Sequence, residues 1–508
     1  MSDKCIVYTS AYNAEKMLIR TIESVLAQTH TNWVWYLLDN GSTDNTGDII
    51  RKYASEYPQI IPLVNKKNRI SEKGNHWHEI IEDYDDADWM CLLDADDEYK
   101  PEFLESSLTF AKIHDLDIVA SGSDFIDAET DEIKSVRISP ENIILDSSEK
   151  FNDFFSEYHR YMRTVWGKLY RIAVLREFDL SKHVLKGYGA DTSFATQCFS
   201  LASRIGILAK SLHIYYISKK SSSYKIDDTR LVCDKILDDI TADFLINKCG
   251  TISTENEYFR NAVYFNGIRD TLNVVFALQV PYAEKINATH KVLLSNNVRR
   301  LIEWSGFKEE KTQLFGSLAK AIATKTEEMQ GRYPQDDHIE TELEIFLNRA
   351  LGVSDEEMFK FLIDVKMKRP LSSEKLDIDV KISEVMEKSV LLGGMTADTA
   401  VFISDAVCAV MRDDLQAALD EVVRLSDCEI PSEHIECYLM FAQYVCAEAE
   451  YAEGWLYFKK SLAQFLLDNA RVDEARFEIE ELEEMLPSDG EVAGLREILD
   501  SQCDRENL

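Results

Sequence analysis

Short apolar runs and amphipathic segments alternate regularly through the first 121 residues, and this alternation limits the folds available to the chain more than any other feature. The apolar runs predict strands at Cys5–Thr9, Trp33–Leu38, Ile60–Val64, Trp89–Leu93 and Ile118–Ser121. Apolar residues at helical spacing predict helices between them, at Lys16–Gln28, Asp48–Tyr57, Gly74–Tyr84 and Pro101–His114. Strands and helices in this order form a doubly wound, mostly parallel α/β sheet.

Polar motifs follow three of the predicted strands: "TSAYN" after the first, "DNGSTD" after the second and "DADD" after the fourth. Ligands of such sheets bind beyond the carboxyl ends of the strands. We therefore expect the three motifs to meet in space and to form a binding site.

The motif after the fourth strand is strongly acidic, with Asp94, Asp96, Asp97 and Glu98 inside five residues. Carboxylates this close repel one another unless a cation lies between them. An EF-hand calcium loop is excluded, because Tyr99 occupies the position where that loop needs glycine. A divalent metal site and a solvated turn remain as alternatives.

The second half of the chain carries few strand signals and many helical ones, for example at Arg230–Asn247 and Ala262–Leu278. Its last hundred residues pair helices in a way that resembles tetratricopeptide hairpins, although the period is irregular. We predict three parts: a sheet domain at 1–225, an α-helical middle domain at 226–395 and an α-helical repeat-like domain at 396–508. Helical repeats commonly bind partners or further copies of themselves, so the helical half is expected to serve a protein partner or a homo-oligomer.

Composition excludes some function classes. The formal net charge of −35 opposes binding to nucleic acid and to anionic lipid. The N-terminus carries no signal-peptide pattern, no apolar stretch is long enough to span a membrane, and the ten cysteines form no CxxC pair. These features predict a cytoplasmic protein with reduced thiols, free or peripheral at the inner face of the membrane.

An ordered series of motifs resembles family 2 inverting glycosyltransferases of the GT-A fold. The series begins with "SAYNAEKMLIRTIESVLAQTH" and "LLDNGSTDNT", continues through "LLDADDEYKPEFLE", "VWGKLYR" and "YGADTSF", and ends with "HIYYISKKSSSYK". It covers roughly residues 1–225. The resemblance implies transfer of a hexosyl or N-acetylhexosaminyl group from a nucleotide sugar, expected to be UDP-linked, to a hydroxyl of a cell-surface glycan or glycoconjugate.

The resemblance also implies a metal cofactor, Mn²⁺ or Mg²⁺, which neutralises charge on the leaving diphosphate. Asp96 is then the metal ligand, Asp94 contacts the ribose or the metal shell, and Asp97 fixes the turn. His213 is a further candidate for a metal or diphosphate ligand, with a structural role as its alternative.

Further contacts to the nucleotide sugar follow from the same resemblance. Asp39 is expected to accept a hydrogen bond from the pyrimidine ring, Tyr12 to flank the base and Glu15 to face the ribose. Ser10 stands where the family usually has proline. The remaining candidates are Arg69 and Asn75 in the "NRISEKGN" stretch and Lys219 and Ser222 in a loop that covers the diphosphate.

Inverting transfer needs a general base, and the family position for it is Asp191 in "GYGADTSF". The alternative role for Asp191 is a helix N-cap. Trp166 and Lys168 are expected to shape the wall of the donor-sugar and acceptor sites. A catalytically inactive, transferase-like scaffold protein is the alternative function, and a nucleotidyltransferase is disfavoured because "VYTSAYNAEK" lacks a glycine-rich basic loop.

Overall fold

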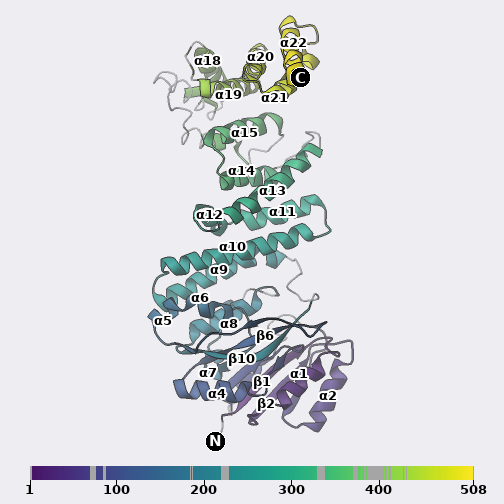
Figure 1. The fold of residues 1–508 in the computed structure, drawn as a ribbon, viewed down its shortest axis with the longest axis vertical. Coiled ribbons are helices and arrows are strands. Elements are labelled where there is room, and N and C mark those ends of the chain that lie inside the picture. The colour runs from purple at the N-terminus through teal and green to yellow at the C-terminus, as the bar shows by residue number, and fades with distance from the viewer. Residues whose placement is uncertain are drawn as a thin grey trace. The chain divides into compact units, whose positions relative to one another are not determined.

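The computed structural model describes residues 3–68, 76–83, 87–182, 185, 187–218, 228–328, 338–369, short stretches of 376–410, and 414–506 apart from 427, 429 and 431. The chain divides into two compact units, Met1–Gly306 and Phe307–Leu508 (Figure 1). The strands of the first unit are β1 (Cys5–Ala11), β2 (Trp33–Asp39), β3 (Ile60–Val64), β4 (Trp89–Leu92), β5 (Glu98–Tyr99), β6 (Ile118–Asp127), β7 (Ile133–Arg137), β8 (Ile143–Leu145), β9 (Lys168–Arg171) and β10 (Ile205–Ile217).

The helices of the first unit alternate with these strands and then continue alone. They are α1 (Leu18–Leu26), α2 (Thr46–Glu56), α3 (Trp77–Asp83), α4 (Phe103–His114), α5 (Ser148–Asp153), α6 (Phe155–Tyr158), α7 (Ile172–Arg176), α8 (Ala190–Leu201), α9 (Asp228–Cys249), α10 (Thr254–Ala277), α11 (Tyr282–Leu293) and α12 (Asn296–Glu303), with 3₁₀ turns η2 (His159–Tyr161) and η3 (Leu180–Lys182).

All ten strands belong to one sheet, whose main path runs β3-β2-β1-β4-β9-β6-β10-β5, with β7 beside β6 and β8 beside β10. Strands β3, β2, β1 and β4 are parallel, as the alternation predicts. The sheet as a whole is mixed, because β9 enters antiparallel to both β4 and β6. The predicted α/β class of the first part and the helical character of the second are therefore confirmed.

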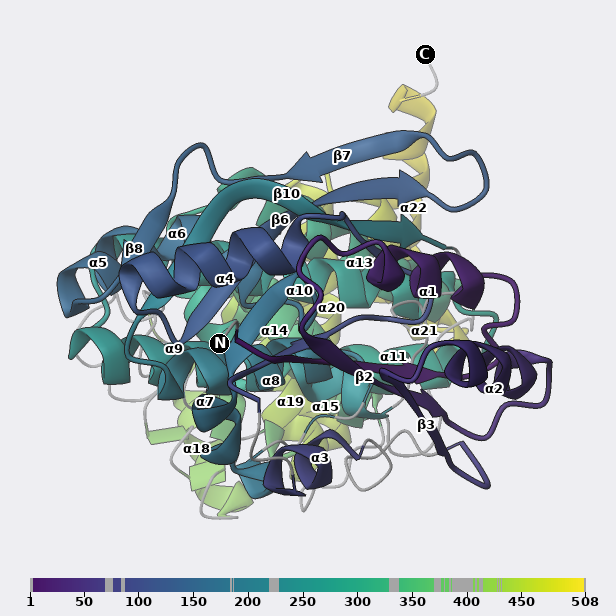
Figure 2. The same ribbon diagram turned by 90° about the horizontal axis from the view of Figure 1, so that it is seen from below.

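Helices cover both faces of the sheet, and β1 shows how the sequence achieves this. Ile6 and Tyr8 point into a core shared with α3, α7 and α8, while Cys5 and Val7 point into a second core shared with α1, α2 and α4. Successive strand side chains face opposite sides, so a strand that is apolar throughout can serve two cores. Figure 2 shows α1 and α4 on one side of the central strands and α3 and α7 on the other.

The first core also includes residues beyond the predicted sheet domain. Phe244 and Leu245 of α9 are almost completely buried and belong to the same apolar cluster as Ile6. The first unit therefore depends on α9 for part of its packing. Both predicted internal boundaries, at 225/226 and at 395/396, lie outside the described residues, and the three-part division stays a prediction.

The second unit contains helices only, within its described residues. They are α13 (Lys308–Glu328), α14 (His338–Leu351), α15 (Asp355–Lys368), α18 (Leu415–Leu425), α19 (Ile435–Glu448), α20 (Ala452–Asp468), α21 (Val472–Met485) and α22 (Gly490–Glu506), with the 3₁₀ turn η6 (Ser432–His434). Helices α19 to α22 pack each against the next in sequence. Small residues allow close packing here, since Ala418 and Ala475 are fully buried.

Three aromatic residues of α20 divide between the core and the surface of the second unit. Phe458 lies in the core, Trp455 is partly buried against it, and Tyr457 is 61% exposed. Two of the three therefore pack internally, and Tyr457 faces solvent.

Candidate functional site

The carboxyl ends of β1, β2 and β4 lie side by side, because β1 pairs in parallel with both of the other strands. The three polar motifs therefore start from one edge of the sheet. The backbone N–H of Asn40 donates to the carbonyl of Ala11 at 2.8 Å, and that of Leu93 donates to the carbonyl of Tyr8 at 3.0 Å. The expected convergence of the motifs is observed.

The loops that follow β1 and β2 are joined by hydrogen bonds. The Asn13 side-chain oxygen accepts from the Thr43 N–H at 2.8 Å, and the Thr46 hydroxyl accepts from the Ala14 N–H at 2.8 Å. One carboxylate oxygen of Glu15 accepts from the backbone and the side chain of Asn45, at 3.1 and 2.8 Å. We name this hydrogen-bonded pair of loops, residues 13–15 and 42–46, the donor-edge loops.

Asp39 is buried at the end of β2, beside the donor-edge loops. One of its carboxylate oxygens accepts from the Ser42 N–H at 2.9 Å. A Cβ atom at Gly47 would stand 2.5 Å from the other oxygen, so glycine at this position makes room for the carboxylate. Tyr12 is 47% exposed, and Ser10 lies within β1 near its end.

The acidic turn after β4 gathers three carboxylates. One ligand oxygen from each of Asp94, Asp96 and Asp97 lies within 4.8 Å of the others. The pKa of Asp94 is well above its usual value, because its surroundings desolvate it and because Asp97, Asp191 and Asp96 carry like charges. Burial likewise raises the pKa values of Asp96 and Asp97. The turn holds more negative charge than its surroundings neutralise.

Arg20 of α1 holds this turn in place. Its guanidinium donates to the carbonyl of Asp96 at 3.0 Å, pairs with Glu98 at 3.1 Å and lies 3.4 Å from the ring centroid of Tyr216. Tyr216 in turn donates its hydroxyl to Glu98 at 2.6 Å and its N–H to Asp97 at 3.0 Å. The acidic turn is thus attached to both α1 and β10.

His213 of β10 lies under the acidic turn and is fully buried. Its Nε2 atom is 3.4 Å from a carboxylate oxygen of Asp97, and its ring stacks on Trp166 with centroids 4.4 Å apart. Neither ring nitrogen has a hydrogen-bond partner among the described residues. Burial, with Arg137 and Lys168 nearby, holds the pKa of His213 well below its usual value, so the imidazole is neutral.

Asp191 stands in the first turn of α8 and its charge reaches Asp94, which places the two predicted site residues in one neighbourhood. Asp191 is solvent-exposed; desolvation by the surrounding protein raises its pKa, while the charge of Lys168 lowers it. The N-cap of α8 is Gly189, and no side chain caps the helix. The alternative role of Asp191 as the N-cap is therefore wrong.

Trp166 and Lys168 lie in the interior rather than on an open wall. Trp166 is 4% exposed and stacks against Tyr215 as well as His213. The ammonium group of Lys168 donates to the carbonyl of Thr164 at 2.5 Å, to its hydroxyl at 3.0 Å and to the carbonyl of Trp166 at 3.2 Å. Both residues support the site from below.

Four of the predicted site residues, Arg69, Asn75, Lys219 and Ser222, lie outside the described residues. Conversely, the structure adds Arg20 and Tyr216, which sequence reasoning missed. Both residues lie far from the acidic turn in the sequence, and no local pattern marks their contact with it. Only the cation in α1 and the aromatic residue near the end of β10 could have suggested a partner for the acidic turn.

The sequence comparisons agree with this arrangement. Residues 6–178, which include the donor-edge loops, Asp39 and the acidic turn, match the family model described as Glycosyl transferase family 2. This part of the chain is a family 2 glycosyltransferase domain. The expected fold class, a GT-A type sheet domain followed by an all-α half, agrees with this family and with the observed elements.

Curated relatives of this glycosyltransferase domain carry transferase names. YibD, an uncharacterized glycosyltransferase of Escherichia coli (strain K12), is 26% identical over 226 residues, which are 44% of this chain and 64% of YibD. GlyA, a glycosyltransferase of Streptococcus pneumoniae, is 22% identical over 231 residues, which are 44% of this chain and 32% of GlyA. The chain thus spans about two thirds or less of the length of these relatives.

Among solved structures, residues 1–349 of TarS from S. aureus, crystallised with UDP-GlcNAc, align with 76% of this chain and 90% of their own. The identity is 16% and the TM-score is 0.39. The family assignment therefore rests on the sequence matches. In the described part of the chain, no helix combines the length and the apolar character needed to cross a membrane.

Proposed function

We propose that the first unit is a metal-dependent inverting glycosyltransferase, which moves a hexosyl or N-acetylhexosaminyl group from a nucleotide sugar to an acceptor hydroxyl. One observation carries this proposal. The acidic turn stands at the carboxyl edge of the parallel strands, and the charge of Asp191 acts on Asp94 within it. A cation-binding turn beside a carboxylate of raised pKa is what sugar transfer from a diphosphate requires.

The residues of the turn fit a hard divalent cation. They offer carboxylate oxygens only, within 4.8 Å of one another, and one buried oxygen of Asp97 has no hydrogen-bond partner among the described residues. Oxygen ligands of this kind suit Mn²⁺ or Mg²⁺. We assign Asp96 as the metal ligand, Asp94 to the ribose or the metal shell, and His213 as a further ligand through its unpartnered nitrogen. When bound, the metal neutralises charge on the departing diphosphate.

His213 is not part of the group of ligand atoms from Asp94, Asp96 and Asp97 that lie within 4.8 Å of one another. Its neutral, buried imidazole nevertheless lies 3.4 Å from Asp97. Asp97 accepts from the Tyr216 N–H, which is the turn-fixing role expected for it.

Asp191 acts as the general base in this proposal. It accepts the proton of the acceptor hydroxyl while that oxygen bonds to the anomeric carbon, and the bond from the anomeric carbon to the diphosphate oxygen breaks. A carboxylate whose pKa is raised accepts protons more readily than an ordinary one. Direct attack by the acceptor inverts the anomeric configuration.

The donor is expected to be UDP-linked and to lie along the donor-edge loops. Asp39 would accept from the pyrimidine ring, exposed Tyr12 would flank the base, and Glu15 would face the ribose with its second carboxylate oxygen. Ser10, Arg69, Asn75, Lys219 and Ser222 complete the proposed donor site. A relative from Shigella flexneri, 26% identical over 101 residues, is named a dTDP-rhamnosyl transferase, so both pyrimidine diphosphates belong in a test.

The acceptor is proposed to be a cell-surface glycan or glycoconjugate, and the helical second unit to serve a protein partner or self-association. The proposed location is cytoplasmic, free or peripheral at the inner face of the membrane.

A calorimetric titration tests the proposal directly. The full chain should bind UDP with Mn²⁺ present and lose most of that affinity in EDTA. Asp96→Asn should abolish both metal-dependent binding and hydrolysis in a screen of nucleotide sugars. Asp115→Asn is the matched control, because Asp115 is highly exposed and has a left-handed backbone that asparagine tolerates. Equal UDP affinity with and without EDTA would reject metal dependence, and binding without turnover for any sugar would favour the inactive scaffold.

A further inference from the structure

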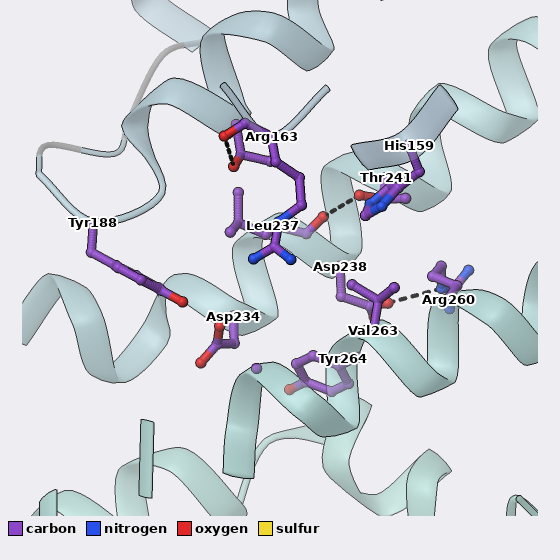
Figure 3. A pocket seen from close by; sticks show the side chains of 12 residues that line it. His159, Arg163, Tyr188, Asp234, Leu237, Asp238, Thr241, Arg260, Val263 and Tyr264 are labelled. Carbon is purple, nitrogen blue, oxygen red and sulfur yellow. Dashed lines mark hydrogen bonds and ion pairs between the residues drawn. The ribbon is translucent and has the colours of Figure 1, made fainter. Parts of the chain in front are cut away.

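A small cavity lies beside the start of α8, away from the donor-edge loops. It has a volume of about 50 Å³, and its walls come from the segment around η2, the start of α8, and the facing sides of α9 and α10 (Figure 3). A single buried water needs roughly 10–15 Å³ of such space. The cavity, which we name the α8 pocket, can therefore hold a group of several heavy atoms. Its polar lining includes His159, Arg163, Tyr188, Thr192, Asp234 and Arg260.

The α8 pocket is adjacent to the proposed base. Tyr188 and Thr192 line the pocket, and Asp191 immediately precedes Thr192 in the first turn of α8. Successive residues of a helix are rotated by roughly 100° about its axis. The Asp191 side chain therefore projects from the same turn as Thr192 but from the adjacent face, within about 10 Å of the pocket. The Thr192 hydroxyl also donates to the carbonyl of Arg163 at 3.2 Å, which ties Arg163 to this turn.

Two arginines, Arg163 and Arg260, and two aspartates, Asp234 and Asp238, line the α8 pocket. Buried Asp238 pairs with Arg260 at 2.9 Å and with Arg300 at 3.0 Å, so two guanidinium groups share one carboxylate. Asp234 is the second acid of the lining, and burial raises its pKa. Arg163 adds a further positive charge. The balanced charge of this lining stands out in a chain whose formal net charge is −35.

Arg163 is the solvent-exposed member of this group, and its charge acts on Asp234. Its guanidinium forms no ion pair or hydrogen bond with any residue that the structure describes, whereas the neighbouring Arg160 pairs with Glu157 at 2.6 Å. Figure 3 shows the Arg163 side chain extending toward the centre of the pocket, between Tyr188 and His159. His159 is neutral, because burial and the charge of Arg163 lower its pKa to about 3. An imidazole in this state can donate one hydrogen bond to a ligand.

We infer that the α8 pocket binds an oxyanion of the acceptor, a phosphate or carboxylate group, through Arg163, and so presents the acceptor hydroxyl to Asp191. This inference rests on the proposed function. A guanidinium binds both kinds of oxyanion through paired N–H donors, and the hydroxyl of Tyr188 and the ring of His159 add donors around the same space. The formal net charge of the chain is −35 and opposes anion binding in general, so a guanidinium in the pocket supplies an attraction that the overall field does not.

Ligand binding to the full chain tests the inference without turnover. The probes are sn-glycerol 3-phosphate and glucuronate, with glycerol and glucose as their neutral counterparts, titrated by calorimetry in the presence of saturating UDP and Mn²⁺ to fill the proposed donor site. Arg163→Gln should weaken binding of the anionic probe by at least about tenfold. Arg160→Gln, which removes an arginine outside the pocket, should leave that affinity unchanged.

The two anionic probes separate the two sources of the oxyanion. Preference for glycerol 3-phosphate indicates a phosphate-bearing acceptor, and preference for glucuronate indicates a uronic acid. Equal binding by wild type and Arg163→Gln, equal binding of charged and neutral probes, or no binding of either anion would overturn the inference. Arg163→Lys, which keeps the charge but not the fork, replaces Arg163→Gln if the latter fails to fold and should bind with intermediate affinity.

Failure of the proposed function gives a different result. If UDP does not bind with Mn²⁺, the same titration in buffer alone still compares Arg163→Gln with Arg160→Gln. Anion binding that depends on Arg163 would then support an oxyanion site in the α8 pocket, while the absence of UDP binding would reject the transferase function. Loss of anion binding with intact UDP binding would reject the pocket alone.

Discussion

Replacement of Arg20 by alanine should loosen the acidic turn and weaken Mn²⁺ binding while the fold survives. The substitution removes the hydrogen bond to the Asp96 carbonyl, the ion pair with Glu98 and the contact with the Tyr216 ring. It leaves Glu98 with the hydroxyl of Tyr216, at 2.6 Å, as its remaining partner. The turn then stays attached to β10 but not to α1.

The magnitude follows from those three contacts. A hydrogen bond that involves a charged group contributes about 1.5–3 kcal/mol, and a cation–π contact about 0.5–1 kcal/mol. The ion pair adds little, because the Arg20 and Glu98 side chains are 34% and 22% exposed. We expect a loss of about 2–4 kcal/mol in the free energy of unfolding. Substitution of a residue that positions a metal ligand typically lowers metal affinity by about 10- to 100-fold.

Electron paramagnetic resonance of free Mn²⁺ measures the affinity, and urea denaturation measures the stability. Arg51→Ala is the matched control, because Arg51 is exposed and pairs only with Asp48 of its own helix among the described residues. Arg20→Lys should restore part of the stability and little of the metal affinity, since lysine cannot make both contacts at once. Mn²⁺ affinity in Arg20→Ala equal to that of wild type would refute the positioning role.

Three further outcomes are expected. Asp191→Asn should keep UDP binding but lower transfer by at least about 100-fold. Asp191 must be ionised to accept a proton, and desolvation raises its pKa. The acid limb of the wild-type pH–rate profile should therefore lie above the range of an ordinary aspartate, and a limb near pH 4 would contradict this. Asp94→Asn should raise the free energy of unfolding at pH 7 without metal by about 1 kcal/mol, because it removes a like charge from the turn. The same substitution should weaken UDP–Mn²⁺ binding. Unchanged or lower stability in urea denaturation would contradict repulsion among the carboxylates. A chain ending at Gly306 should fold and bind UDP. A chain ending between 225 and 240 should not fold, because it lacks Phe244 and Leu245 of the sheet core. Circular dichroism and calorimetry of both chains test this, and a stable shorter chain would show that α9 is dispensable.

The parallel part of the sheet could be predicted from the sequence because its signals are local. Each strand from β1 to β4 is a continuous apolar run, and the acidic turn follows the last of them directly. The antiparallel entry of β9 could not be predicted, since it depends on pairing with strands that lie far away in the sequence. The same limit applies to β5, whose two residues form a strand only through their pairing with β10.

The candidate site shows a similar division. Asp39, Asp94, Asp96 and Asp191 stand in recognisable motifs, and the structure brings the acidic turn and Asp191 together. Residues that hold the motifs in place carry no signal of their own. Lys168, for instance, is buried, and its ammonium group donates to three acceptors from two neighbouring residues. Such contacts depend on side-chain packing, which spacing along the chain does not reveal.

The donor-edge loops have a consequence for how donor preference can change. Because Asn13 and Glu15 of one loop bind Thr43 and Asn45 of the other, the two segments respond to substitution as a single unit. Substitution of Glu15 already removes its hydrogen bonds to Asn45, so substitution of Asn45 afterwards removes fewer contacts. The effects of the two substitutions should therefore be less than additive. Under the proposed function, a new nucleotide specificity would therefore arise through paired changes in both loops, and single substitutions in either one would mainly reduce affinity for every donor.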